Sequence, residues 1–600
     1  MRRNAKVRLA VFLWLQTTAC GPQPTEPTPT PLPDSATPAP TSTATPDVPG
    51  DTPLGPDATP PPETPPGPTP GPPSPLEPTP SPVPTPTTPP TPWPTPPTTA
   101  AETPTPEEAF TPTPGAGTPL PFDVTPTPAS TPVSPPFLRV DSSNPIPLVK
   151  RFEVDLESPG AVRLVCEEQG GEGERHVVRA AGADRYFLSV RGLKPATRYE
   201  CRAEREDRTG LSSEPVEVGT DPLPGDLEAP VLMVQDAPRD RIGYALFNYS
   251  HDTGGWVYES RYLVIVDADG HVRWYLPGVG GGTIDATYIG EDRVLYGGYA
   301  FGETHPTIST LDWVVLFEDT SGPPEPHGMI GSYHHDVGLA VEGDAIFALM
   351  KIMIDDTQQG YTVRHVDLGS NLLWEWDSAV DGRDAGYLPV GDDSTNDPYH
   401  ANSAQDVWEQ GRRYIYVGMR TTSSIIKIDY ETKAVLWTLG VDGDFVLLEP
   451  DGTPAEDYRW FFMQHDAKRY GDRMVIYDNG LLRRDYGGPY NYSRALELEL
   501  DEQAMTARIT FEYDEAAEGW IEEAWGGCDL LANGNYFIAM GHCWDCNPNN
   551  THLSALVEVD PNGRQISRLE WTNPEVALYR ADRIDGCAIF ANTTYCPELE

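Results

Sequence analysis

The sequence predicts an all-β protein in which a six-bladed β-propeller follows a small β-sandwich and a long proline-rich linker. Three observations predict this. First, 44 of the 67 prolines fall between Gly21 and Pro136. Second, the rest of the chain shows short runs of alternating apolar and polar residues and no long helical pattern. Third, polar anchor residues recur there at intervals of 65, 65 and 63 residues, and such a period is typical of repeat folds.

Residues 1–20 have the pattern of an export signal. Four basic residues precede a short apolar run at 9–15, which is too short to span a bilayer. The small residues before Cys20 resemble a bacterial lipobox, so we expect lipidation at Cys20 and a lipid anchor in a bacterial membrane. Gly21 in place of aspartate favours the outer membrane, with the protein in the periplasm or on the cell surface. Thr17 stands where leucine is usual, which leaves ordinary signal cleavage or no lipidation open.

Residues 21–136 consist of Thr-Pro repeats with almost no aromatic or branched apolar side chains. Such a composition cannot bury enough apolar surface to offset its ordering entropy. We therefore predict a disordered linker that acts as a semi-rigid stalk.

Residues 137–222 alternate apolar and polar side chains over short runs, as in 151–156 (RFEVDL) and 161–166 (AVRLVC), which predicts a small β-sandwich. The run 192–199 (GLKPATRY) is similar to the corner of a fibronectin type III domain, with Tyr199 as its corner tyrosine. Cys166 and Cys201 are disulfide candidates, because an exported chain meets oxidising conditions. We expect this fibronectin III-like module to act as a spacer or as the contact of a homodimer.

Residues 223–600 contain two interleaved repeats. The first is an apolar run, an aspartate and a turn, often followed by a tryptophan, and it predicts strand, turn, strand. The second is a polar anchor a few residues before a glycine turn, with anchors at His335, His400, His465 and Cys528. The available length holds about six units of this spacing, and radial four-stranded blades are one way to protect sheet edges, so we predict a six-bladed propeller. The repeat is weaker before residue 329, which leaves five or seven blades open.

Equivalent anchors on successive blades point to one end of the central channel, so His335, His400 and His465 are expected to converge. A single histidine before a tight turn would merely cap backbone groups. Three of the 12 histidines in register favour a shared site instead. Asn402 and Arg420 lie near these histidines in the predicted blades.

The charge balance excludes one class of partner. Lys and Arg number 42 against 90 Asp and Glu, and the net charge of −48 would repel the phosphates of a nucleic acid. The chain contains no Gly-Lys dipeptide and hence no nucleotide-binding phosphate loop. We expect no cofactor and no metal.

An ordered series of motifs runs from residue 332 to the end of the chain. These are 333–336 (YHHD), 399–403 (YHANS), 418–420 (GMR), 426–429 (IKID), 437–440 (WTLG), 464–467 (QHDA), 477–480 (YDNG), 492–495 (YSRA) and 531–535 (LANGN). The series resembles the bacterial arylsulfate sulfotransferases, which are propeller enzymes of the periplasm that do not use the nucleotide donor PAPS.

The resemblance implies that His465 is a nucleophile that takes a sulfuryl group from an aryl sulfate donor and passes it to a phenolic acceptor. His335, His400, Arg420 and Asn402 would supply hydrogen-bond donors to the sulfuryl oxygens. Whether His334 or His335 faces the site stays open, although the register with His465 favours His335. Two alternatives remain: a non-catalytic cell-surface binding or adhesion module, and a metal-dependent hydrolase that uses the histidine cluster.

Five further cysteines lie in the predicted last blades: Cys528, Cys543, Cys546, Cys587 and Cys596. We predict two disulfides and one free or intermolecular thiol among them. A zinc site around 542–546 is the alternative.

Overall fold

The computed structural model describes residues 134–597 except 143–145, 172, 239–242, 253–257, 278–284, 298–304, 320–332, 355–356, 389–395, 516–519, 542–553, 585 and 594. The predicted signal, Cys20 and the predicted linker up to residue 133 lie outside the described residues. No helix in the described part of the chain is long and apolar enough to cross a membrane.

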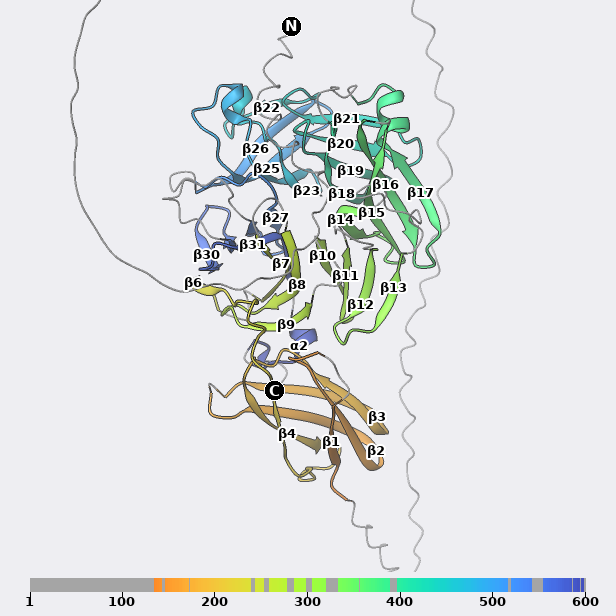
Figure 1. Cartoon of the computed structure of the whole chain (residues 1–600), viewed down its shortest axis with the longest axis vertical. Coiled ribbons are helices and arrows are strands. Elements are labelled where there is room, and N and C mark those ends of the chain that lie inside the picture. The colour runs from red at the N-terminus through yellow and green to blue at the C-terminus, as the bar shows by residue number, and fades with distance from the viewer. Residues whose placement is uncertain are drawn as a thin grey trace, which may run out of the picture. The chain divides into compact units, whose positions relative to one another are not determined.

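The N-terminal domain is one antiparallel sheet that closes over its own core (Figure 1). Its strands are β1 (Phe137–Asp141), β2 (Lys150–Glu168), β3 (Arg175–Val190), β4 (Arg198–Arg205) and β5 (Val216–Gly219). The first part of β2 pairs with β1 and its last part with β4, while β3 follows it along almost its whole length. Side chains of both parts, such as Phe152 and Leu164, share one buried core.

Two predicted features of this domain can be located. Cys166 and Cys201 face each other across β2 and β4 and form a disulfide. The hydroxyl oxygen of Tyr199 accepts a hydrogen bond from the backbone N–H of Lys194 at 2.9 Å, which is how a corner tyrosine ties its turn. The wider fibronectin III likeness stays a prediction.

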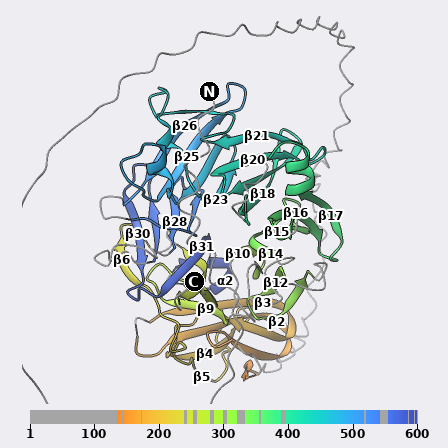
Figure 2. The ribbon, with the colours of Figure 1, turned by 45° about the horizontal axis from the view of Figure 1, so that its top comes forward.

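Six sheets stand around a common centre, which confirms the predicted all-β propeller (Figure 2). We number them as blades in chain order. Blade 1 has β31 (Val576–Ile584), β7 (Tyr244–Asp252), β8 (Tyr258–Val266) and β9 (Val272–Pro277); blade 2 has β10 (Asp285–Gly290), β11 (Arg293–Gly297), β12 (Thr307–Thr310) and β13 (Val315–Glu318); blade 3 has β14 (Tyr333–Leu339), β15 (Ala345–Met353), β16 (Gln359–Asp367) and β17 (Leu372–Asp377).

The three remaining blades follow the same plan. Blade 4 has β18 (Ala401–Glu409), β19 (Arg412–Met419), β20 (Ser424–Asp429) and β21 (Val435–Gly440); blade 5 has β23 (His465–Tyr470), β24 (Arg473–Asp478), β25 (Arg494–Asp501), β26 (Thr506–Tyr513) and the added parallel strand β22 (Val446–Leu448); blade 6 has β27 (Gly527–Leu530), β28 (Tyr536–Met540), β29 (Ala555–Val559), β30 (Gln565–Glu570) and the added β6 (Val231–Gln235). Short helices occur at η2 (Ser378–Asp384), η3 (Asp457–Arg459), η4 (Arg483–Tyr486) and α2 (Cys587–Phe590).

Strands from the two ends of the described chain close the ring. The late strand β31 pairs with β7 to complete blade 1, and the early strand β6 pairs with β30 at the edge of blade 6. The strands next to the channel are β10, β14, β18, β23, β27 and β31, each in contact with its neighbour in the ring. Hydrogen bonding between β31 and β7 covers one edge of each strand that would otherwise be free.

The first sequence repeat has a clear structural basis in its aspartates. Their Oδ1 atoms accept backbone N–H groups of the following tight turn in five blades, and these residues are Asp267, Asp367, Asp429, Asp501 and Asp560. This is the usual way in which an aspartate stabilises a turn.

The tryptophans of the same repeat connect neighbouring blades. The indole N–H of Trp274 in blade 1 donates to Leu311 O at 2.9 Å, and that of Trp374 in blade 3 donates to Tyr430 O at 2.8 Å. The indole N–H of Trp437 in blade 4 donates to the carboxylate of Glu502 in blade 5 at 3.1 Å. The repeat thus encodes one turn and one contact between blades.

Two of the five late cysteines, Cys587 and Cys596, form a disulfide. Cys528 is a buried free thiol on β27. Cys543 and Cys546 lie outside the described residues, so the predicted second disulfide and the zinc alternative stay predictions.

Candidate active site

The inner strands bring the three predicted histidines to one end of the channel. His335 is the third residue of β14, His400 directly precedes β18, and His465 is the first residue of β23. The side chains of His465 and His335 are 1% and 6% exposed. His335 and His400 have positive φ values of 68° and 46°, and Asp466 has 51°. Such backbone conformations are costly for residues other than glycine and often occur at functional sites.

Ring contacts connect the histidines. The rings of His335 and His465 lie 6.3 Å apart between centroids, and Tyr579 of β31 stacks on His335 at 5.7 Å. The ring of His334 packs edge-on against His335 at 3.7 Å. Both rings contact His400, at 5.0 Å for His335 and 5.9 Å for His334, but His335 is the one whose ring also contacts His465 and Tyr579.

The hydrogen bonds around His465 fix its tautomer. Asn479 donates its side-chain N–H groups to the backbone oxygens of Glu522 and Trp525 at 3.2 and 3.0 Å. Its Oδ1 therefore faces His465 Nδ1, 2.8 Å away, and can only accept a hydrogen bond. Nδ1 of His465 must carry the proton. Nε2 then holds a lone pair, which in this structure accepts the backbone N–H of Trp525 at 3.3 Å.

A second chain of hydrogen bonds runs through the other two histidines. Asp397 Oδ2 lies 2.9 Å from His400 Nδ1, so the neutral His400 donates from Nδ1 and accepts at Nε2. His400 Nε2 lies 3.0 Å from His335 Nε2, which must therefore be the donor. His335 Nδ1 is then the acceptor for the hydroxyl of Tyr579 at 2.8 Å. All bonds of the chain point from Tyr579 towards Asp397.

Burial and positive neighbours keep these imidazoles neutral. Burial lowers the pKa of His465 well below its ordinary value, and the guanidinium of Arg420 acts in the same direction. Burial also lowers the pKa values of His335 and His400, although Asp397 opposes this at His400. A neutral His465 is the form that can act as a nucleophile.

Arg420 follows β19 and lies beside this cluster. Its backbone N–H donates to His400 O at 3.1 Å, and its Nη2 donates to Glu523 O at 2.9 Å. Its Nε is buried and has no hydrogen-bond acceptor among the described residues. A guanidinium stays charged even when burial lowers its pKa, as burial does here. This buried N–H fits an anionic oxygen of a substrate.

Asn402 makes a hydrogen bond between neighbouring blades. Its side chain is fully buried, and its Nδ2 donates to Gln464 O at 2.7 Å. It therefore connects β18 to the residue before His465. The ring N–H groups of His335 and His400 are likewise already used in the chain described above.

Below the histidines, charged residues connect the inner strands. Arg580 of β31 forms ion pairs with Asp336 and Asp466 at 3.2 and 3.3 Å and lies 3.6 Å from Asp285. Asp336 and Asp466 also accept backbone N–H groups from the next blade. The aspartates that follow the histidine anchors thus hold the blades in register.

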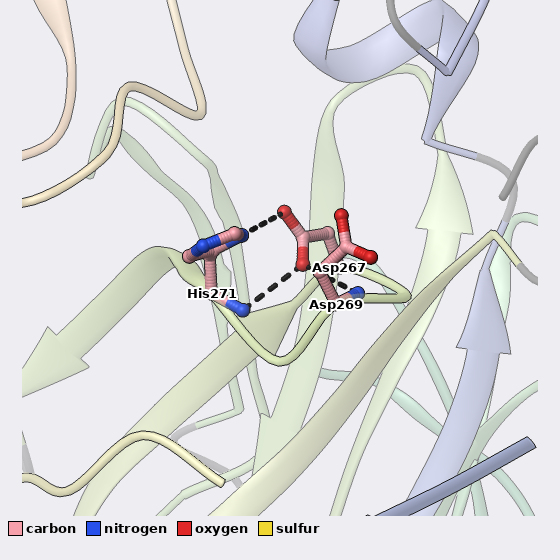
Figure 3. A group of neighbouring side chains, drawn as sticks. All are labelled: Asp267, Asp269 and His271. Atoms are coloured by element: carbon pink, nitrogen blue, oxygen red, sulfur yellow. Dashed lines mark hydrogen bonds and ion pairs between the residues drawn. The ribbon is translucent and has the colours of Figure 1, made fainter. Parts of the chain in front are cut away.

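A separate group of side chains has the spacing of metal ligands. Figure 3 shows Asp267, Asp269 and His271, whose ligand atoms lie within 4.8 Å of one another. Asp267 Oδ1 accepts backbone N–H groups from Asp269 and His271, and its Oδ2 pairs with Arg273 Nε at 2.5 Å. Arg273 is buried and also bonds Glu174 of the N-terminal domain. This is the turn aspartate of the repeat, neutralised by an arginine, and it lies away from the histidine cluster.

The sequence pattern did not indicate a role for several residues of the site. Tyr579 and Arg580 occupy a strand that lacks a histidine anchor, and Asp397 lies outside both repeats. Asn479 belongs to the quoted motif 477–480, but the motif gave no role for it. The one sequence feature that could have indicated Asp397 is its position three residues before the predicted anchor His400.

Comparison with known proteins gives a family and a set of distant folds. The model of the family described as Arylsulfotransferase (ASST) matches residues 253–580. No curated protein sequence matches the chain. Similar solved structures include TolB from Acinetobacter baumannii, with 9% identity, a TM-score of 0.33 and coverage of 65% of this chain and 81% of TolB. Another is the periplasmic gluconolactonase PpgL of Pseudomonas aeruginosa, with 12% identity, a TM-score of 0.30 and coverage of 70% and 99%.

Proposed function

The chain belongs to the arylsulfotransferase family, and from this premise we propose that it moves a sulfuryl group from an aryl sulfate ester to a phenolic acceptor through a sulfohistidine on His465. The observation that carries the proposal is the tautomer of His465. Its Nδ1–H is held by Asn479, so its Nε2 lone pair lies on the side of the ring that faces away from that amide.

The first half-reaction forms one bond and breaks one. The Nε2 lone pair gives up its hydrogen bond from the backbone N–H of Trp525 and attacks sulfur, the S–O bond to the aryl group breaks, and its electrons leave with the phenolate oxygen. The product His465 carries SO₃ on Nε2 and a proton on Nδ1. Asn479 Oδ1 stabilises the positive charge that develops on the ring, as an acceptor does for a catalytic imidazole.

Arg420 is the donor that fits the sulfuryl oxygens. Charge on these oxygens is stabilised by donors that are already in place before reaction. The buried Nε–H of Arg420 has no other described acceptor, and its guanidinium interacts with His465 electrostatically. Asn402 supports the strand that carries His465 through Gln464.

In the second half-reaction, the oxygen of a phenolic acceptor attacks the sulfur of the sulfohistidine. The N–S bond breaks, its electrons return to Nε2, and the acceptor leaves as an aryl sulfate. Two-step transfer of this kind predicts ping-pong kinetics.

The test uses the full chain with 4-nitrophenyl sulfate as donor and phenol as acceptor. We expect a burst of nitrophenol without phenol, continuous release with phenol, and loss of both in His465→Asn. His271→Asn, on the partly exposed turn of Figure 3, is the matched control and keeps activity. Release that needs no acceptor and is abolished by a chelator would instead indicate a metal-dependent hydrolase. If wild type and His465→Asn are both inactive, the result would favour the alternative of a non-catalytic binding module.

We further propose that the protein is exported and anchored by a lipid on Cys20, with residues 21–136 as a stalk and the N-terminal domain as spacer or dimer contact. The composition of residues 1–133 supports this. Cys20→Ser should move the protein from the membrane fraction to the soluble fraction of the cell envelope. Retention of the variant in the membrane would contradict the anchor.

A further inference from the structure

Asp397 collects four hydrogen-bonding groups on one buried carboxylate. It accepts the backbone N–H and Nδ1 of His400 at 3.0 and 2.9 Å, and the hydroxyl of Tyr361 at 2.9 Å. Lys351 Nζ lies 3.4 Å away, and the carboxylate side chain is 14% exposed. Tyr361 and Lys351 come from β16 and β15 of blade 3, so two blades converge on this carboxylate.

From this geometry we infer that Asp397 is a positioning residue that sets the direction of a proton relay from Tyr579 through His335 to His400. The inference rests on the proposed function. Asp397 forces His400 to donate from Nδ1, so His400 Nε2 must accept from His335, and His335 Nδ1 must accept from Tyr579. A single carboxylate thereby decides three hydrogen-bond directions.

The relay serves the acceptor half-reaction. As the phenol oxygen bonds to sulfur, its proton passes to Tyr579 Oη, the proton of Tyr579 passes to His335 Nδ1, and the proton on His335 Nε2 passes to His400 Nε2. The proton ends on His400, whose imidazolium is stabilised by Asp397. Protons and charge balance over a full cycle, because the first half-reaction releases the donor's phenolate and the second releases one proton, which together make the neutral phenol.

Asp397 suits this role because it stays ionised. Burial favours its protonated form, but His400, Lys351 and Tyr361 outweigh burial and lower the pKa of Asp397. The other charged or titratable groups that interact with it are Arg420 and His334. An ionised carboxylate stabilises an imidazolium without itself taking the proton.

The test compares the two half-reactions in Asp397→Asn with those of Asp384→Asn, an exposed matched control. Single-turnover nitrophenol release reports the first half-reaction, and turnover with a series of phenols of different acidity reports the second. We expect Asp397→Asn to slow transfer to phenol by about 10²-fold or more, the range typical of acid-base catalysis. This loss in the rate of transfer to phenol should be at least tenfold larger than the loss in the burst rate. It should be smaller for more acidic phenols, because these are deprotonated more easily.

Two results would overturn the relay. Equal losses in both half-reactions, or the same loss for acidic and weakly acidic phenols, would mean that Asp397 only supports the fold. If wild type shows no nitrophenol burst, the proposed function is wrong. The hydrogen-bond directions set by Asp397 can then still be tested by a measurement that does not depend on activity.

That separate measurement is ¹⁵N NMR of the histidine-labelled full chain. We expect His400 protonated at Nδ1 and His335 protonated at Nε2 at neutral pH. Tyr361→Phe, a milder change that removes one donor from Asp397, covers the case in which Asp397→Asn does not fold. It should shift the acidic limb of the pH profile for phenol transfer to higher pH, because Asp397 and His400 then hold a proton more tightly. The opposite tautomers, or an unshifted profile, would contradict the inference.

Discussion

One amide decides which nitrogen of His465 can react. Asn479 donates to two backbone oxygens, so its Oδ1 is the only atom left to face His465 Nδ1. Asn479→Leu would leave Nδ1–H buried without an acceptor and allow the other tautomer. We expect kcat to fall by about 10²- to 10⁴-fold, the cost of a misoriented catalytic imidazole.

The matched control for this variant is Asn491→Leu, because the described hydrogen bonds of Asn491 go to the backbone of Arg484 and Leu481 and to none of the histidines. Steady-state kinetics with nitrophenyl sulfate and phenol give the comparison. Similar losses in the two variants would show that a general loss of folding, not the tautomer, is responsible.

Arg420 uses two parts of one side chain for different purposes. Its Nη2 holds Glu523 O, and its Nε is the buried donor without a described acceptor. Arg420→Lys keeps the charge but cannot provide both donors. We expect a loss of about 10²- to 10³-fold in kcat/KM, as for removal of one donor to a developing anion. A lysine variant with wild-type kcat/KM would exclude the guanidinium from sulfuryl binding.

At the residue scale, the sequence predicted the three histidines because they repeat in register. It could not predict Tyr579 or Asp397, since their roles depend on a strand from the far end of the chain and on a carboxylate outside the repeats. Asn402 was predicted as a sulfuryl ligand, but its described hydrogen bond goes to Gln464 O. Residue type and spacing do not show which way an amide points.

At the scale of elements, α2 packs against blade 1, and the disulfide Cys587–Cys596 closes the C-terminal segment that carries it. The ring of Phe590 lies 4.7 Å from Tyr244, and Tyr595 lies 5.3 Å from the same ring. Cys596→Ser opens the short loop and frees this segment. We expect the free energy of unfolding to fall by about 2–4 kcal/mol, the usual value for a structural disulfide.

Urea denaturation of the oxidised wild type and of Cys596→Ser measures this difference. Equal stability of variant and oxidised wild type would show that the packing of Phe590 and Tyr595 is sufficient without the bond.

The elements also show where sequence reasoning loses its signal. Blades 3 to 6 were recognisable because each begins with an anchor and has a glycine turn after its inner strand. Blade 1 takes its inner strand from Val576–Ile584, more than 300 residues after β7, so no local pattern could reveal it. The weak repeat in blade 1 has this physical cause, whereas blade 2 has a local inner strand, β10, that carries no histidine anchor.

At the scale of the whole propeller, buried carboxyl groups in the channel make stability depend on pH. Burial raises the pKa of Asp582 to about 6, and burial raises the pKa values of Asp285 and Asp529 as well. Since these pKa values lie above those of the unfolded chain, the stabilisation is complete below about pH 4 and is lost as pH rises through 6. The buried neutral histidines act in the opposite direction, because their lowered pKa values stabilise the fold above about pH 6.5, so substitution is needed to isolate the contribution of the carboxyl groups.

Asp582→Asn isolates the effect. The amide is neutral at every pH, so the stability gained by the variant over wild type should be larger at pH 8, on the order of 2 kcal/mol, than at pH 5.5. Calorimetry at both pH values checks this. A variant that is less stable than wild type at pH 8 would mean that Asp582 is ionised and stabilises through Lys468.

The closing strand β31 has a consequence for when activity can arise. Tyr579 and Arg580 belong to the last inner strand to be synthesised, yet they contact His335 and the aspartates of blades 2, 3 and 5. Under the proposed mechanism, a nascent chain therefore has its nucleophile but neither the relay tyrosine nor the cation that connects the inner strands. Activity would then begin only when synthesis is nearly finished, and we expect a chain interrupted before residue 576 to be inert from the start.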